Sequence, residues 1–317
     1  MRVNKKRVRR IVMLCGMLGA AASARAYVEE TANPLILGPM GSSLSGLFPV
    51  EPLAKGQSQI NVAGLYYTAT ESHNSLNDDG FFLDKKYSGG GGSVSWIYGL
   101  SEHWSVSAVG AYAAGTNDFT VSAGGSSFPI SNLVAGNPLM HGTGTDSGGM
   151  GAVTAAYDPT SPEGRFKFPM IAGLVYVNST ASAQTPFTIT QGPFAGQSAT
   201  KTEQTKVSGP APVLGFAPEF DAWTFRLMPF FYAVLPIGAS SNYTGQVTAN
   251  GRLVQASNGT NATGGSGTSD SFHGIVDLGA RVIYRPWGLG LTWIPAIYFP
   301  LAGARIQLYS LTWSRRL

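Results

Sequence analysis

Apolar and aromatic side chains recur at every second position in several short segments, and this pattern constrains the fold more than any other feature of the sequence. The clearest segment carries Trp104, Val106, Ala108, Gly110, Tyr112 and Ala114. Successive side chains of a β-strand point to opposite faces, so this period indicates a sheet with two different faces. The other face is small and mildly polar: Ser105, Ser107, Val109, Ala111 and Ala113. Large side chains toward lipid and small ones toward a wet lumen are typical of a membrane barrel.

The same alternation recurs along the chain in further segments, which we predict to belong to tilted strands that cross a bilayer. These segments are 60–66, 94–100, 153–157, 223–235 and 272–284. The links between them alternate between long and short, as in a barrel with an exterior and a periplasmic rim. The long links are 71–86, 116–147, 181–205 and 238–270. The sequence therefore predicts an all-β fold, a transmembrane antiparallel up-and-down β-barrel of about 10 to 12 strands. Ten is the direct count, and twelve applies if residues 35–53 or a long loop add a hairpin.

The N-terminal residues 1–26 are typical of a secretory signal peptide. A basic start, MRVNKKRVRR, precedes an apolar run at 11–22 and the small-residue motif Ala24-Arg25-Ala26. These are the three parts of such a signal, and cleavage after the motif would make Tyr27 the first mature residue. Export together with membrane strands predicts a protein of the Gram-negative outer membrane.

The remaining chain divides into two predicted parts. Residues 27–56 contain Pro34, Pro39, Pro49 and Pro52, which favour an extended leader that can enter the barrel mouth as a plug. Residues 57–317 carry the alternating segments and form the predicted barrel.

Loss of the signal changes the charge and cysteine content of the predicted mature chain. Seven of the 21 basic residues and the single cysteine lie within 1–26, which leaves 14 basic residues against 17 acidic ones. A slightly acidic chain does not favour a nucleic-acid partner, which would normally meet a basic face. Without cysteine, neither disulfides nor thiolate metal sites are expected.

Motifs for catalysis or metal binding do not occur in the sequence. The four histidines, His73, His103, His141 and His273, form no HExxH motif, and no GxSxG is found. The run 89–92 consists of glycine but lacks the Gly-Lys-Ser/Thr of a phosphate loop, so it indicates close approach or a bend. We therefore expect no enzymatic activity, no metal and no cofactor.

A charged stripe is the main candidate for a functional site. His273, Asp277 and Arg281 share one parity, opposite to the apolar positions of their segment, so they are predicted to face the lumen. Arg226 has the same inward parity on the preceding predicted strand. One interpretation is a charged constriction that selects solutes, and the alternative is an ion-pair network that satisfies charges inside a narrow barrel. The sequence leaves both open.

The C-terminal segment 309–317, YSLTWSRRL, alternates to its end. It resembles the C-terminal signal of outer-membrane barrels, which implies contact with the barrel-assembly machinery during insertion and with outer-membrane lipid afterwards. Leu317 stands where that signal usually has phenylalanine, and Arg315 interrupts the apolar face.

Residues 57–317 resemble the outer-membrane family named after the meta-pathway of phenol degradation. The features that carry the resemblance are the hairpin WIYGLSEHWSVS at 96–107, the run FPMIAGL at 168–174 and the closing strands. The resemblance implies an outer-membrane channel or transporter for small, hydrophobic or aromatic molecules. The alternatives are a structural or adhesive surface barrel with a plugged lumen, and an outer-membrane enzyme. A barrel of this size leaves limited interior room, which argues against a wide general porin.

The export prediction can be tested on the protein purified from membranes. N-terminal sequencing should begin at or near Tyr27, and the protein should fractionate with outer membranes, because lipid-facing strands need a bilayer. A retained Met1, or recovery in the soluble periplasm without detergent, would contradict the prediction.

Overall fold

A computed structural model describes residues 46–47, 53–75, 81–123, 130–136, 138–160, 164–235, 239–260, 275–297 and 305–317. This part of the chain is one antiparallel sheet of fourteen strand segments. They are β1 (Ser58–Ser75), β2 (Phe81–Gly99), β3 (Trp104–Ser122), β4 (Leu139–Tyr157), β5 (Phe166–Lys167), β6 (Met170–Thr188), β7 (Ser198–Phe216), β8 (Glu219–Ala222), β9 (Phe225–Val234), β10 (Ser240–Ala249), β11 (Arg252–Thr260), β12 (Ile275–Tyr284), β13 (Leu289–Ile297) and β14 (Arg305–Arg316). Two short 3₁₀ turns, η2 (Ile130–Asn132) and η3 (Arg285–Trp287), lie in the links.

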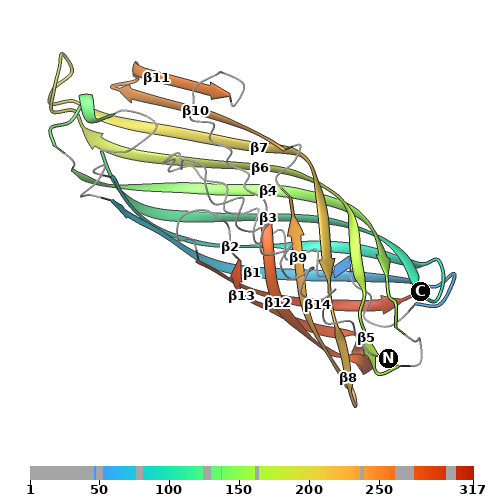
Figure 1. Cartoon of the computed structure of the whole chain (residues 1–317). Coiled ribbons are helices and arrows are strands. Elements are labelled where there is room, and N and C mark those ends of the chain that lie inside the picture. The colour runs from blue at the N-terminus through green and yellow to red at the C-terminus, as the bar shows by residue number, and fades with distance from the viewer. Residues whose placement is uncertain are drawn as a thin grey trace, which may run out of the picture.

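The sheet closes on itself into a barrel (Figure 1). Ten of the segments form the ring, in the order β1, β2, β3, β4, β6, β7, β9, β12, β13 and β14, and β14 pairs with β1 again. Every pairing in this ring is antiparallel, as an up-and-down barrel requires. The transmembrane β-barrel predicted from the sequence is confirmed, and the ring has the smaller of the two predicted strand numbers.

The four remaining segments prolong strands of the ring. β7 pairs with β9 near its C-terminal end and with β10 over its N-terminal half, so β9 and β10 follow one another along β7. β11 pairs with β10, and β12 pairs with β9. At the other end, β5 and β8 pair in the register of β6 and β7, as Phe166 with Phe220 and Met170 with Phe216 show.

The strands extend well into segments that were predicted as long loops. β2, β3, β4, β6 and β7 each contain 19 residues, whereas a strand needs about 9 to 11 residues to cross a bilayer. The added lengths carry Thr, Ser, Asn, Gln and charged residues toward solvent, as at 116–120 and 178–184. The outward positions there are polar, and the inward ones mix apolar side chains such as Phe119 with charged ones such as Lys85. No sustained apolar period therefore marks these extensions in the sequence, and the loop prediction was wrong.

The outer surface of the barrel carries an apolar belt. Its exposed side chains include Val62, Val94, Trp96, Val153, Leu174, Leu214, Leu227, Leu278, Val282, Leu291 and Leu311. Aromatic side chains border the belt on both sides: Trp104, Tyr157, Phe166, Phe220, Phe225 and Trp287 at the end with short turns, and Tyr66, Tyr112 and Tyr176 toward the other end. Aromatic girdles around an apolar band are the features that a barrel presents to lipid. The chain is therefore an outer-membrane barrel.

Among the described residues, no helix is long and apolar enough to span a membrane.

Side chains of the opposite parity fill the lumen. The larger buried cluster includes Leu65, Tyr67, Val109, Met150, Val175, Met228, Phe230, Tyr232, Ile294 and Leu308. A second cluster at the outer end includes Leu83, Phe119, Val121, Met140 and Val247, together with Ile130 and Val134 from the link between β3 and β4. The predicted parity of strand β3 is confirmed, because Ser107, Val109 and Ala113 are buried while Tyr112 is exposed. In this structure the lumen is packed rather than wide.

The glycine run of β2 serves close approach, as its sequence indicated. A Cβ on Gly89 would lie 2.5 Å from the Tyr67 hydroxyl oxygen, and one on Gly115 would also collide with that hydroxyl. The ring of Tyr67 therefore lies flat against the wall where two neighbouring strands lack side chains. Gly91 likewise leaves no room for a Cβ against the backbone of β3.

Residues 46–47 and 53–56 of the predicted leader are described, and Gly46 and Leu47 lie against the inner face of the barrel. The carbonyl of Gly46 accepts hydrogen bonds from Asn61 Nδ2 (2.9 Å) and Ser95 Oγ (2.7 Å). Leu47 is fully buried in the larger apolar cluster. The predicted signal peptide lies outside the described residues, as does most of the leader.

The two faces of β12 allow a test of side-chain orientation. Leu278 is 61% exposed on the apolar belt, so Leu278→Arg should destabilise the barrel by about 2 to 4 kcal/mol near the bilayer midplane. Leu278→Ile should have little effect. Folding into lipid vesicles, followed by the heat-dependent shift on gels, measures the difference, and equal folding of both variants would contradict the assigned orientation.

The neighbouring Gly279 faces the lumen, and the structure leaves no room for a side chain there. A small change such as Gly279→Ser would be mild if this lumen-facing position were open. A Cβ there would instead lie 2.6 Å from Phe230 Cζ and 2.9 Å from Ile294 Cγ1. Gly279→Ser should therefore also impair folding, because the added side chain would push Phe230 and Ile294 out of their places in the packed lumen.

Candidate functional site

The lumenal face of β9 and β12 combines aromatic and charged side chains. Alternation along β9 turns Arg226, Met228, Phe230, Tyr232 and Val234 inward, and alternation along β12 does the same for Asp277, Gly279, Arg281 and Ile283. The two strands pair directly, so these side chains form one continuous wall, which we call the lumenal wall.

Three members of the predicted charged stripe lie on this wall. Arg226, Asp277 and Arg281 are all buried toward the lumen, and His273 lies outside the described residues. The register places Asp277 opposite Tyr232, Arg281 opposite Met228, and Arg226 opposite Ile283. Arg281 therefore lies between Asp277 and Arg226 along the wall. The structure brings the three charges onto one face.

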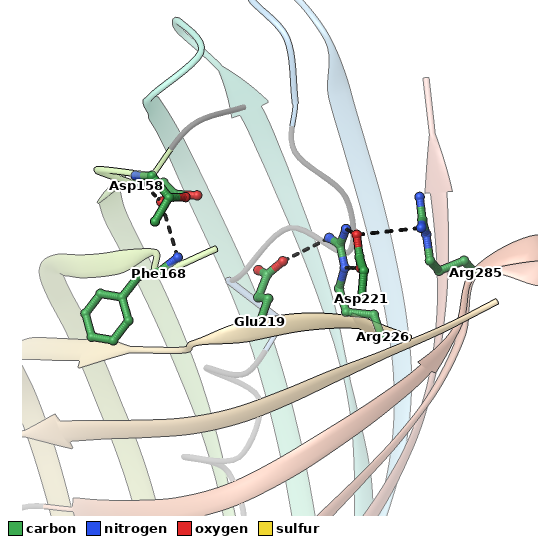
Figure 2. Close-up of polar contacts among 7 residues, drawn as sticks. Asp158, Phe168, Glu219, Asp221, Arg226 and Arg285 are labelled. Atoms are coloured by element: carbon green, nitrogen blue, oxygen red, sulfur yellow. Dashed lines mark hydrogen bonds and ion pairs between the residues drawn. The ribbon is translucent and has the colours of Figure 1, made fainter. Parts of the chain in front are cut away.

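Arg226 is the centre of an ion-pair network near the short-turn end (Figure 2). Its Nε donates to Asp221 Oδ1 at 2.6 Å, and its Nη2 donates to Asp221 Oδ2 at 3.0 Å. Its Nη1 donates to Glu219 Oε2 at 2.9 Å. The planar guanidinium meets one carboxylate in the bidentate geometry that gives strong ion pairs. Arg285 lies at the edge of the network, 3.7 Å from Asp221 Oδ2.

Asp221 lies beside the turn between β8 and β9, at the rim of the barrel. Partial burial raises the pKa of Asp221, but the hydrogen bond from Arg226 and the positive charges of Arg226, Arg285 and Lys167 outweigh it. The pKa of Asp221 therefore lies below its usual value. A lowered pKa in the folded state means that this interaction stabilises the barrel at neutral pH and is lost as the pH falls through that pKa.

Asp277 contrasts with this network. Its carboxylate and the Tyr232 hydroxyl interact electrostatically across the β9–β12 pair. Their geometry falls outside that of a full hydrogen bond, and neither group has another hydrogen-bond partner among the described residues. The Thr292 hydroxyl on β13 is likewise unpartnered within this part of the chain. The wall thus carries polar atoms for which the described part of the chain provides no full hydrogen bond.

Aromatic rings lie directly beside these polar atoms. Phe230 and Tyr232 stack with their ring centroids 5.5 Å apart and their planes 8° apart. The Phe230 ring rests over Gly279, where a side chain would displace it. The inward parity of this segment placed Arg226 in the predicted stripe, but its inward apolar residues were not predicted to belong to the site. The signal was present, since Met228, Phe230 and Tyr232 alternate with the lipid-facing residues.

A second buried ionic cluster lies farther toward the outer end, and sequence analysis missed it entirely. Lys85 on β2 is almost fully buried, with Nζ 4.6 Å from the Tyr87 ring centroid. Its charge interacts with Glu71, Asp146 and Glu203, which belong to three other strands. Glu203 accepts a hydrogen bond from the Tyr243 hydroxyl at 2.7 Å and forms an ion pair with Lys201 at 2.9 Å. All these residues except Tyr87 lie in the long links predicted from the sequence, and Tyr87 follows one of them directly. No strand was predicted there, so no inward parity was assigned to these side chains.

The described residues contain no group of three His, Cys, Asp or Glu side chains arranged to hold a metal ion. His103 lies in the short turn before β3, where its Nδ1 is 2.8 Å from the Asp158 carbonyl oxygen. His141 lies on the outer face of β4, 3.0 Å from the Thr120 hydroxyl.

No family model and no curated protein sequence matches the chain. Several solved structures are similar at low identity. The outer membrane protease OmpT from Escherichia coli has a TM-score of 0.47 and 11% identity, over 82% of this chain and 95% of that one. The transport unit of the autotransporter AIDA-I from Escherichia coli has a TM-score of 0.40 and 11% identity, over 92% and 99%. The toluene transporter TodX from Pseudomonas putida has a TM-score of 0.29 and 9% identity, over 93% and 94%.

The Arg226 network can be tested by removing its cation. Arg226→Met should destabilise the barrel by about 3 to 5 kcal/mol, because it leaves the buried Glu219 carboxylate without its partner. Arg285→Met removes a cation at the exposed edge of the same network and should cost under about 1 kcal/mol. Urea unfolding in lipid vesicles measures both. Equal stability of the two variants would show that Arg226 does not hold the network together.

Proposed function

We propose that this protein is an outer-membrane channel for small molecules, in particular hydrophobic or aromatic ones that carry a polar group. The observation that carries the proposal is the lumenal wall, where the stacked Phe230 and Tyr232 lie beside the carboxylate of Asp277, which interacts with the Tyr232 hydroxyl but has no hydrogen-bond partner of full geometry among the described residues. A buried polar group without a partner costs about 1 to 3 kcal/mol. A lumen that served only as a packed core would gain stability from pairing or replacing it, whereas a solute or water inside a channel can supply the missing partner.

The charges on the wall suit selection among such solutes. Asp277, Arg281 and Arg226 follow one another toward the short-turn rim, so a molecule that moves along the wall meets one negative and then two positive side chains. His273, the fourth member of the predicted stripe, belongs to the same proposal although it lies outside the described residues. The proposal involves no catalytic step.

A surface barrel with a plugged lumen is the second candidate, and one observation favours it. The outer apolar cluster places Ile130 and Val134, from the link between β3 and β4, against the inward side chains of the strands. The leader residue Leu47 is also buried in the lumen. A permanently closed barrel would keep these contacts, whereas a channel has to open them.

Transport measurements on the purified barrel separate the two candidates. In planar bilayers the wild type should conduct, and swelling of proteoliposomes should be faster with phenol or benzoate than with a disaccharide. Asp277→Asn keeps the shape of the side chain but removes its charge. Reversal potentials should then shift toward anion preference, because Arg281 and Arg226 remain in a confined space where screening is weak.

Lys206→Gln provides the matched control, because Lys206 is exposed on the outer face of β7 and its loss should leave the reversal potential unchanged. A wild-type barrel that is folded but neither conducts nor takes up any of these solutes would support the plugged barrel and refute the channel. Unchanged selectivity in a conducting Asp277→Asn barrel would remove the wall charges from the proposal.

A further inference from the structure

The outward face of the barrel changes its chemistry at a line of three tyrosines. Tyr66, Tyr112 and Tyr176 lie exposed on β1, β3 and β6. On the short-turn side of this line the exposed side chains form the apolar belt. On the other side, the outward positions of β3, β4 and β6 carry Thr116, Asp118, Thr120, His141, Thr143, Thr145, Ser147, Asn178, Thr180, Ser182 and Gln184. Tyrosine is favoured where an apolar layer meets a polar one. The wall beyond the line therefore stands in the headgroup layer and above it.

A groove of about 410 Å³ opens on this polar wall, across β2, β3 and β4. Pro186 on β6 contributes an exposed apolar ring, and the polar lining comes from Asp84, Lys86, Asp118, Thr120, His141 and Thr143. We call it the outer groove. It lies on the lipid side of the barrel wall and is separate from the lumen.

The strand register brings the polar side chains of the outer groove together. On the outward face of the β2–β3 pair, Lys86 lies opposite Asp118, and Asp84 lies opposite Thr120 two residues farther along. Thr120 in turn lies opposite His141 on β4, and their side chains are 3.0 Å apart at Oγ1 and Nδ1. This contact leaves the second ring nitrogen of His141 for a ligand. The groove thus combines two carboxylates, one ammonium group, one imidazole and two hydroxyls on a single face.

We propose that the outer groove binds the phosphorylated saccharide of the glycolipid in the outer leaflet of the outer membrane. The carboxylates of Asp84 and Asp118 can accept hydrogen bonds from sugar hydroxyls, and Lys86 can meet a phosphate as a point charge. Two carboxylates beside one lysine do not suit a bare phosphate. They suit a ligand that offers several hydroxyl donors together with an anionic group, and the Pro186 ring gives the C–H face of a sugar an apolar surface.

The position of the groove selects the glycolipid over other ligands of similar chemistry. It lies beyond the aromatic line, at the end of the barrel that carries the link between β3 and β4, and this is the end predicted to face the exterior. At that height, outward-facing side chains contact the saccharide portion of the outer-leaflet glycolipid. The membrane holds this saccharide at high local concentration and in a fixed orientation. This proposal concerns the outer face and does not depend on whether the lumen conducts.

Binding measurements on the purified barrel in phospholipid nanodiscs test the proposal. The probes are lipopolysaccharide with a complete inner core, lipid A without core sugars, and phosphatidylglycerol. The wild type should bind the lipopolysaccharide more tightly than either lipid that lacks core sugars. The double variant Lys86→Gln with Asp118→Asn should bind it about tenfold more weakly, as expected for the loss of charge-assisted hydrogen bonds. Its affinity for lipid A should fall much less.

Two further variants keep the test decisive. Lys206→Gln removes an exposed lysine of the polar wall outside the groove and should bind lipopolysaccharide as the wild type does. His141→Gln should weaken binding severalfold, and it serves if the double variant folds poorly. Equal affinity of the wild type for lipopolysaccharide and lipid A would overturn the proposal. So would an equal loss in Lys206→Gln and the double variant, because nonspecific charge attraction would then explain the binding.

Discussion

The pairing of β7 with β9 closes the sheet, and the distinction between lumen and exterior depends on it. It spans only residues 213–216 against 231–234, while the β14–β1 seam runs from Gln59 to Thr70 on β1. In lipid, an open edge would leave backbone N–H and C=O groups without water or partners, at a cost of several kcal/mol each. The β7–β9 pairing is short because the N-terminal half of the same edge of β7 pairs with β10. β7 therefore belongs both to the ring and to its extension.

Closure also creates the electrostatic conditions of the lumen. Inside the ring, side chains are removed from water, so every charge must be compensated nearby or it destabilises the fold. Arg226 meets this condition with Glu219 and Asp221, and Lys85 interacts with acidic groups from three other strands. Asp277 does not meet it to the same degree, since its carboxylate interacts with the Tyr232 hydroxyl but has no full hydrogen bond among the described residues. A lumen that compensates most of its charges but buries one incompletely paired carboxylate beside stacked aromatic rings differs from a uniform packed core.

The exterior carries two chemistries on the same strands. Strands of 18 or 19 residues exceed the bilayer, so their outer halves leave the apolar layer and meet polar surroundings. The change occurs at Tyr66, Tyr112 and Tyr176, and beyond it the outward positions become hydroxyl, amide and charged groups. A barrel of this length has a lipid-facing belt and a second outward surface above it, and each can carry its own contacts.

Alternation along the chain determined the fold class, the parity of Arg226, Asp277 and Arg281, and the lipid-facing position of Leu278, because a two-residue period assigns each side chain to one face of a sheet. The glycines at 89–92 signalled close approach for a similar local reason. Only the tertiary structure could show that Tyr67 fills this space, that Glu219 and Asp221 meet Arg226, and that Lys85 lies among Glu71, Asp146 and Glu203. These contacts join strands that are distant in sequence, and the register of those strands depends on ring closure. The lengths of the strands beyond the membrane were also decided there. Backbone pairing continues where the outward face is polar and the inward face mixes apolar side chains such as Phe119 with charged ones such as Lys85.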